Sequence, residues 1–160
     1  MLKDSIFGGT INRLLQIVAR VAPGAQTWRV RLHRWRGVNI GEQVWVGYDA
    51  ILETGFPQLI TLKDRCTIGV GVIIIAHMHG TRGVVIEEDV TIGPGAVILP
   101  SVTVGKGSIV TAGSVVTRSV PPMTMVQGNP AKPVARLGKM LLPGVSMKEF
   151  SKHLRPISSP

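Results

Sequence analysis

Apolar residues recur every six positions along the middle of this chain. Between Leu62 and Pro121, branched aliphatic side chains begin nine of ten successive six-residue units. The unit starts are Leu62, Ile68, Ile74, Gly80, Ile86, Ile92, Ile98, Val104, Val110 and Val116. A period of six fits neither a helix nor a long strand that alternates every second residue. It predicts short strands joined by regular turns and stacked into a parallel β-helix, in which each unit buries its apolar face against its neighbours.

The same unit also appears earlier, beginning at Ile40 and Val46, but the phase is lost after Leu52. Ten residues rather than six separate Leu52 from Leu62, so we expect four surplus residues, 55–58, to leave the coil as a loop. Such loops often carry function. In the unit that begins at Ile74, the pattern places Met78 at an inward position.

Composition agrees with one domain built on an aliphatic core, since 44% of the residues are hydrophobic and only 4% aromatic. We expect an N-terminal basic helical cap over residues 1–36, the repeat over 37–121, and a C-terminal loop with a short helix over 122–160. The fold class is all-β. The single cysteine, Cys66, stands at an inward position, and we interpret it as a core residue in a reducing compartment.

The net charge of +9 is concentrated in the two flanks. Residues 1–36 hold seven basic side chains and one acidic, residues 132–160 hold six and one, and the repeat between them is slightly acidic. Such flanks suit nucleic acid, an anionic membrane surface or a phosphate-bearing small molecule. Because no zinc pattern or aromatic RNA-binding motif accompanies the arginines, we expect no nucleic-acid partner.

The apolar residues between Ile11 and Ala19 have helical spacing. A basic amphipathic helix followed by tryptophans suits a membrane interface, but a cap over the open end of a β-helix needs the same apolar face, and capping is our first interpretation. The sequence shows no apolar run long enough to span a membrane, and its N-terminus makes a poor signal peptide. We therefore expect a cytoplasmic protein, with peripheral association at the inner face of the membrane as the alternative.

His77 and His79 are the two histidines within the repeat. They are two residues apart, so a regular strand would place them on one face, pointing outward if Met78 points inward. Histidine titrates near neutral pH, so an outward histidine in a cleft is a natural general base. The alternative interpretation is a pair of solvated surface histidines.

The hexapeptide ladder and three further segments together resemble the hexapeptide-repeat acyltransferases. The segments are Ile75-Ala76-His77, residues 92–100, and Gly128-Asn129-Pro130-Ala131-Lys132. The resemblance covers about residues 37–137 and is strongest to the sugar and polysaccharide O-acetyltransferases, such as the maltose and nodulation-factor enzymes. It implies a left-handed parallel β-helix, a homotrimer with active sites between subunits, acetyl-CoA as co-substrate, and no metal.

The resemblance also implies roles for single residues. His77 falls on the position of the family's base, which would take a proton from a sugar hydroxyl as its oxygen attacks acetyl-CoA directly. The family commonly has His-Pro at this point, whereas this chain has His77-Met78-His79. Because of this departure, His79 keeps a lesser claim to the role of base; otherwise it would contact the acceptor. Trp45 and Tyr48 would stack on a sugar ring or, equally, pack between subunits. The residues implied at the acetyl-CoA groove are Ala112, Thr117, Arg118 and Lys132.

Two other functions stay open at this point. A γ-type carbonic anhydrase uses the same coil with three zinc histidines, and a third ligand here would have to be His33 or His153 from the flanks. A trimeric scaffold without catalysis is the other alternative. The sequence leaves the acceptor undetermined among surface-polysaccharide sugars, oligosaccharides, nucleotide sugars and small xenobiotics, and an amine acceptor is also open.

Overall fold

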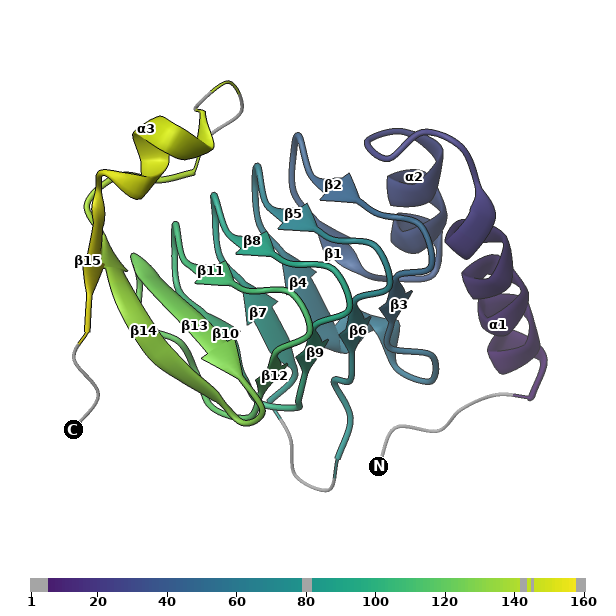
Figure 1. The fold of residues 1–160 in the computed structure, drawn as a ribbon. Coiled ribbons are helices and arrows are strands. Elements are labelled where there is room, and N and C mark those ends of the chain that lie inside the picture. The colour runs from purple at the N-terminus through teal and green to yellow at the C-terminus, as the bar shows by residue number, and fades with distance from the viewer. Residues whose placement is uncertain (1–5, 79–81, 142–143, 145, 158–160) are drawn as a thin grey trace.

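The computed structural model describes residues 6–78, 82–141, 144 and 146–157. Short strands stack into three sheets that form the sides of a prism (Figure 1). Sheet A holds β1 (Asn39–Ile40), β4 (Ile60–Leu62), β7 (Val84–Ile86) and β10 (Thr103–Val104). Sheet B begins with β2 (Trp45–Val46), β5 (Thr67–Ile68), β8 (Thr91–Ile92) and β11 (Ile109–Val110). Sheet C holds β3 (Ile51–Leu52), β6 (Ile73–Ile74), β9 (Val97–Ile98) and β12 (Val115–Val116).

The core is a set of aliphatic ladders that run along the axis of the coil. In sheet B, Ile68 pairs in parallel with Ile92, and Ile92 pairs with Val110; all three side chains are almost fully buried. Each strand offers one inward residue, which contacts the equivalent residue of the coils before and after it. The predicted left-handed parallel β-helix is confirmed, and Cys66 is buried in its core, where burial raises the pKa of the thiol to about 12.

Close stacking explains why glycine follows several inward aliphatics. A Cβ added to Gly93 would lie 2.5 Å from the backbone nitrogen of Ala112 in the next coil, which is closer than real Cβ contacts. The corner between sheets B and C can therefore stack at this spacing only with glycine at that position.

Two segments leave the coil, and both do so at the corner between sheet C and sheet A. The first lies between β3 and β4 and includes the short 3-10 helix η1 (Pro57–Leu59), as the lost phase predicted. The second lies between β6 and β7, where Met78 is 68% exposed, so the prediction that Met78 points inward is wrong. Strands on successive faces otherwise start about six residues apart, but twelve residues separate Ile74 from Ile86. The second insertion thus equals one repeat in length and keeps the phase.

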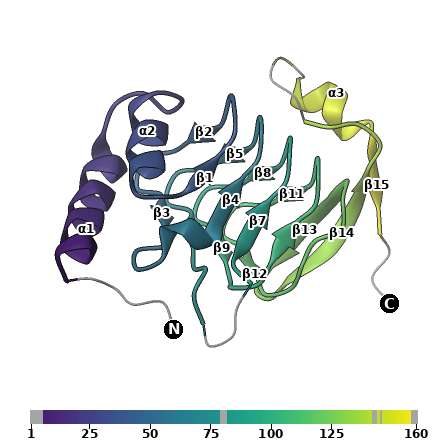
Figure 2. The same cartoon turned by 180° about the vertical axis from the view of Figure 1, so that it is seen from behind.

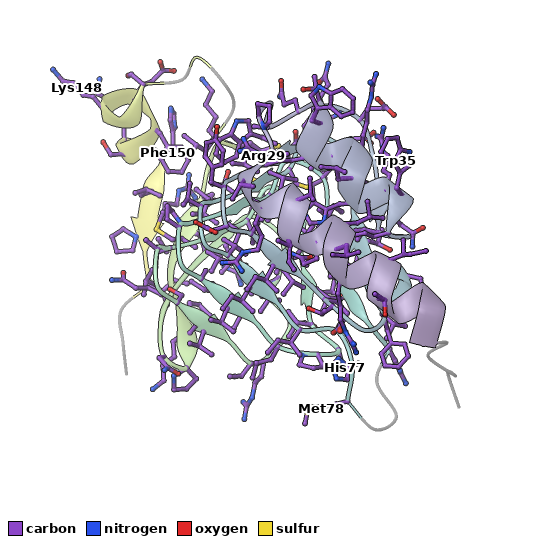
Figure 3. All side chains as sticks on the ribbon, turned by 90° about the vertical axis from the view of Figure 1, so that its right-hand side faces the viewer. Arg29, Trp35, His77, Met78, Lys148 and Phe150 are labelled. Carbon is purple, nitrogen blue, oxygen red and sulfur yellow. The ribbon has the colours of Figure 1, made fainter. Side chains whose placement is uncertain are left out.

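The N-terminal end of the coil is covered by α1 (Ile6–Val21) and α2 (Trp28–Trp35) (Figures 1 and 3). Side-chain amides of α1 donate to carbonyls along the free edge of the first coil: Asn12 Nδ2 to Thr54 O at 2.6 Å and Gln16 Nε2 to Ala50 O at 3.0 Å. We call α1 and α2 together the helical cap. No helix in the described part of the chain is long and apolar enough to cross a membrane.

At the other end, the chain continues sheet B instead of forming the loop that the sequence suggested. Strand β13 (Thr124–Gly128) pairs in parallel with β11 and turns back as β14 (Ala131–Leu137), which pairs antiparallel with β13 (Figure 2). The short helix α3 (Met147–Ser151) and β15 (Leu154–Pro156) follow, and β15 extends the same sheet. Sequence reasoning missed the hairpin because the six-residue pattern stops at Pro121 and the hairpin strands do not repeat it.

Candidate active site

The two insertions bring Glu53 and His77 together. Leu52 pairs with Ile74 in sheet C, so Glu53 leaves the first coil directly beside the start of the second insertion. Glu53 Oε2 accepts hydrogen bonds from His77 Nδ1 at 2.7 Å, from the backbone N–H of Ala76 at 2.9 Å and from that of His77 at 3.2 Å. Its other oxygen accepts from the N–H of Gly55 at 2.8 Å.

These hydrogen bonds favour the ionised form of Glu53. Burial of Glu53 would raise its pKa, but the hydrogen bonds from His77, Ala76 and Gly55 favour the carboxylate more strongly, and the net effect lowers the pKa below its usual value. A carboxylate can only accept, so His77 donates from Nδ1; in the neutral imidazole, Nε2 is then the acceptor nitrogen. The His77 side chain is 54% exposed while that of Glu53 is 2% exposed. A buried acid therefore orients a histidine that is open to a substrate.

The first insertion also supports the histidine ring. Phe56 meets the ring of His77 edge to face, with centroids 5.6 Å apart. Glu53 has a φ of +27°, a conformation that side chains rarely adopt and that costs free energy unless the surroundings impose it. Here the bonds made by its carboxylate hold the residue in place. In Figure 3, His77 lies at one edge of the coil and Met78 projects beyond it.

The helical cap holds the backbone of Glu53 from the opposite side. Arg36 is buried and donates to the carbonyl oxygen of Glu53, to Asn12 Oδ1 at 2.7 Å and to His33 Nδ1 at 2.9 Å. Since a guanidinium only donates, His33 must accept at Nδ1. Burial, followed by the charge of Arg36, lowers the pKa of His33 to about 3, so this histidine is neutral. One guanidinium thus joins both cap helices to the residue that orients His77.

Four of the other residues that sequence reasoning proposed lie along two edges of sheet C. Thr117 and Arg118 are exposed at the corner between sheets C and A. This is the same corner as that of His77, because the backbone N–H of Ile75 donates to the coil that contains Leu99, and the N–H of Leu99 donates to Val116 in the coil after it. Ala112 is exposed at the opposite corner, between sheets B and C.

Tyr48 stands at this second corner too. The backbone N–H of Gly71 donates to Tyr48, that of Gly95 to Val70 and that of Gly113 to Pro94, so one column of turns runs from Tyr48 to Gly113. Arg29 covers one face of the Tyr48 ring at 3.9 Å from its centroid.

Lys132 is an exposed residue of β14, paired with Gln127 of β13. The tip of this hairpin is tied to the B–C corner, because the N–H of Gly128 donates to Ser114 Oγ at 3.1 Å. A single chain therefore keeps Ala112 and Lys132 near one edge of sheet C, and His77 with Thr117 on the other edge.

Trp45 lies elsewhere, on the outer face of sheet B. It lines a groove of about 960 Å³ with Arg65 and Asp89, whose side chains are paired at 2.7 Å. His79 lies outside the described residues. Among the residues that are described, no three His, Cys, Asp or Glu side chains gather closely enough to hold a metal ion.

Comparison with known proteins identifies the repeat. Residues 83–118 match the model of the bacterial transferase hexapeptide family, described as six repeats. This stretch of the chain is similar to the repeats of that family. It is 48% identical over 86 residues to the "Putative acetyltransferase C18B11.09c" of Schizosaccharomyces pombe, a match that covers 54% of this chain and 29% of that protein. The chain thus spans less than half the length of the curated relatives it matches.

Two solved structures of hexapeptide-repeat enzymes share the fold. One is a hexapeptide-repeat acetyltransferase from Vibrio cholerae O1 biovar eltor complexed with acetyl-CoA, with a TM-score of 0.65 and 23% identity over 83% of this chain and 88% of that one. The other is a galactoside acetyltransferase in complex with coenzyme A, with a TM-score of 0.57 and 22% identity over 84% and 85%. At these identities the likeness concerns the fold.

Within this hexapeptide-repeat chain, Glu53 is the site residue that sequence reasoning missed. The signal was present in the spacing. The loop after Leu52 adds four residues to the coil, so the residue beside Ile75 in the stack is found 22 positions earlier, at Glu53. Counting the insertion into the coil would have placed an acidic side chain next to His77.

Proposed function

We propose that this protein is an acetyltransferase that moves the acetyl group of acetyl-CoA to a hydroxyl group, with His77 as the general base. The observation that carries the proposal is the bond between His77 Nδ1 and the buried carboxylate of Glu53. It makes Nδ1 the donor, so that Nε2 of the neutral imidazole is the nitrogen to which an acceptor hydroxyl can give up its proton. The match of residues 83–118 to the bacterial transferase hexapeptide family supports the reaction class.

The reaction is a direct transfer. His77 Nε2 takes the proton of the acceptor hydroxyl as its oxygen attacks the thioester carbonyl; a C–O bond forms, the C–S bond breaks, and the proton passes to the departing thiolate. Glu53 keeps the Nδ1 proton in place and stabilises the imidazolium that forms, without taking the proton itself. The carboxylate is a positioning group, since the histidine is the group that touches the acceptor.

A homotrimer would complete the site. The outward residues of sheet C form an aliphatic column, whereas those of sheet A include Asn39, Thr61 and Thr103. A half-buried apolar face of this kind suits contact with other copies of the chain. The residues of the sheet C column are Ile51, Ile73, Val97 and Val115.

Such packing would also join the two edges of sheet C. If three copies turn sheet C toward a common axis, the corner with His77 and Thr117 of one copy meets the corner with Ala112 of the next. Acetyl-CoA would then lie between subunits, with Lys132 available to its phosphates as an exposed cation. We propose a sugar as the acceptor, on the resemblance to the sugar O-acetyltransferases and the fold shared with a galactoside acetyltransferase.

The test is release of CoA thiol from acetyl-CoA, measured against a panel of sugars, nucleotide sugars, amino acids and amines. We expect His77→Ala to lower kcat at least about a hundredfold with an unchanged circular dichroism spectrum. The matched control is His153→Ala, which removes an exposed histidine near the opposite end of the coil. Unchanged turnover in His77→Ala would contradict the assignment, and failure of the wild type to bind CoA would favour the scaffold.

A second variant separates orientation from proton transfer. Glu53→Gln keeps the size of the side chain but removes its charge, so we expect a loss in kcat of about a hundredfold with little change in KM. Glu42→Gln is the control, because Glu42 is exposed and pairs with Arg34 at the surface. Equal activity of the Glu53 and Glu42 variants would remove Glu53 from the mechanism.

A further inference from the structure

Helix α1 has its polarity reversed relative to a normal surface helix. The side that faces the coil carries small and polar residues, among them Asn12, Gln16 and Ala19, and the two amides are used as hydrogen-bond donors to the coil. The opposite side is aliphatic and open. Its exposed fractions are 58% for Leu14, 59% for Ile17, 50% for Val18 and 69% for Val21.

This arrangement means that capping alone does not explain the apolar residues of α1. A cap would bury its aliphatic stripe against the coil. Here the stripe points away from the coil, at the end of the molecule that Figure 3 presents to the viewer. Two tryptophans of α2, the other helix of the cap, are also exposed, Trp28 at 50% and Trp35 at 65%. We call these residues the outer face of the cap: Ile11, Leu14, Ile17, Val18, Val21, Trp28 and Trp35.

The positive charge around the outer face of the cap indicates which kind of partner this face would bind. Residues 6–41 contain six arginines and no acidic residue. Arg13 and Arg31 are exposed, and Arg31 lies 5.7 Å from the centroid of the Trp28 ring. Even with Glu42 and Asp49 of the first coil, which pair with Arg34 and Arg20, the local charge stays positive. Contact between two such faces would bring like charges together, whereas an anionic surface would neutralise them.

We propose that the outer face of the cap is a peripheral docking surface for an anionic lipid bilayer. Aliphatic residues and tryptophans on a helix that lies in the plane of the interface enter the headgroup region, while the flanking arginines meet lipid phosphates. Each feature contributes modestly, but they act together on one rigid end of the molecule. The inference is independent of the proposed function, since lipid binding needs neither acetyl-CoA nor an acceptor.

The experiment is co-sedimentation of the full chain with vesicles. One set is phosphatidylcholine alone, and the other contains about 30% phosphatidylglycerol, enough to give the surface a negative potential. We expect binding to the anionic vesicles, weaker binding to neutral ones, and a loss of binding at high salt. The fluorescence of the tryptophans should shift to the blue on binding, and Trp35→Phe should reduce the shift.

The decisive variant is Leu14→Gln/Val18→Gln/Val21→Gln, which changes exposed side chains without touching the amides that hold α1. We expect its partition to anionic vesicles to fall at least about tenfold, because burial of these side chains drives insertion. Val70→Gln, which changes an exposed apolar residue on the coil, should bind as the wild type does. CoA release with a water-soluble acceptor should be the same in the triple variant and the wild type.

Three results would overturn the inference. The first is a wild type that stays in the supernatant with anionic vesicles, and the second is a triple variant that binds them as tightly as the wild type. A smaller mass of the triple variant in light scattering, with vesicle binding unchanged, would show instead that the outer face contacts a second copy. Loss of turnover without loss of vesicle binding would concern the catalytic proposal alone.

Discussion

The coil and the helical cap are held together by different interactions. In the coil, aliphatic side chains such as Ile68 and Ile92 stack in columns and the hydrogen bonds are made by the backbone between neighbouring coils. In the cap, side-chain amides and the guanidiniums of Arg34 and Arg36 reach carbonyl oxygens of the first coil. The difference shows what the end of a solenoid requires: carbonyls without a next coil must find other donors.

The C-terminal end solves the same problem with backbone. There β13 adds a parallel strand to β11, and β14 and β15 extend the sheet beyond it. A helix cannot supply backbone donors along its side, since its own N–H groups are used internally. The N-terminal cap therefore depends on Asn12, Gln16 and Arg36, and a single substitution there should have consequences that a single substitution in the C-terminal hairpin would not.

The largest expected effect on stability lies in the coil. Ile92→Ala removes a fully buried side chain between two coils, and we expect the free energy of unfolding to fall by about 2–5 kcal/mol. Thr91→Ala, at the outward position of the same strand, should cost much less. Denaturant unfolding followed by circular dichroism measures both. Equal losses would mean that the ladder does not hold the coil together.

Most of the coil was predictable because its signal is periodic. The inward positions of β5, β8 and β9 follow from the count of six, and the structure places Ile68, Ile92 and Ile98 in the core. The same count failed at Met78, because an insertion of one full repeat leaves the period intact. The six-residue period gives the number of residues between strands, but it does not tell whether the residues between two strands remain part of the coil.

The candidate site was predictable only in part. His77 stood out because it interrupts an apolar ladder, but Glu53 required the register between coils, and Arg36 required the position of the cap. Neither is marked by local pattern: Arg36 is one of several arginines in its segment, and the sequence does not reveal that it alone joins Asn12, His33 and Glu53. Contacts between distant segments depend on packing that one-dimensional spacing does not contain.

Acid should weaken the cap before it weakens the coil. The pKa of His33 is about 3 in the folded protein and 6.5 in the unfolded chain. The unfolded state therefore binds more protons in this range, and the free energy of unfolding should fall as the pH drops below about 6.5, by at most about 1.4 kcal/mol per pH unit. Glu53 contributes only at lower pH, because its pKa lies below the ordinary 4.5.

Unfolding measured between pH 7 and pH 5 checks this expectation, since that range, about two units wide, precedes the titration of most carboxylates. His33→Phe should reduce the dependence of the free energy of unfolding on pH, whatever its effect on stability at neutral pH. His153→Ala is the control, because His153 is exposed. A slope that persists in His33→Phe would place the acid sensitivity elsewhere.

Arg36→Met should lower both the stability of the protein and its catalytic rate. The substitution keeps much of the apolar stem but leaves the Glu53 carbonyl and Asn12 without their donor, and we expect a loss of about 1–3 kcal/mol in stability. Because the backbone of Glu53 is then less well held, kcat should also fall while KM for acetyl-CoA stays nearly constant. Arg31→Met, at an exposed position of α2, the helix that Arg36 follows, should change neither. A stability loss without any change in kcat would separate the cap from the active site.

The smallest expected effect belongs to the surface contact between the cap and the coil. Arg20 pairs with Asp49 at 3.1 Å, and the two side chains are 43% and 57% exposed, so water and salt screen the pair. Arg20→Gln should therefore cost no more than about 1 kcal/mol, and the difference should shrink further in high salt. Denaturant unfolding at low and high ionic strength measures it. A cost that matches that of Arg36→Met would mean that exposed charge, and not the buried hydrogen bonds of Arg36 and the amides, attaches the cap to the coil.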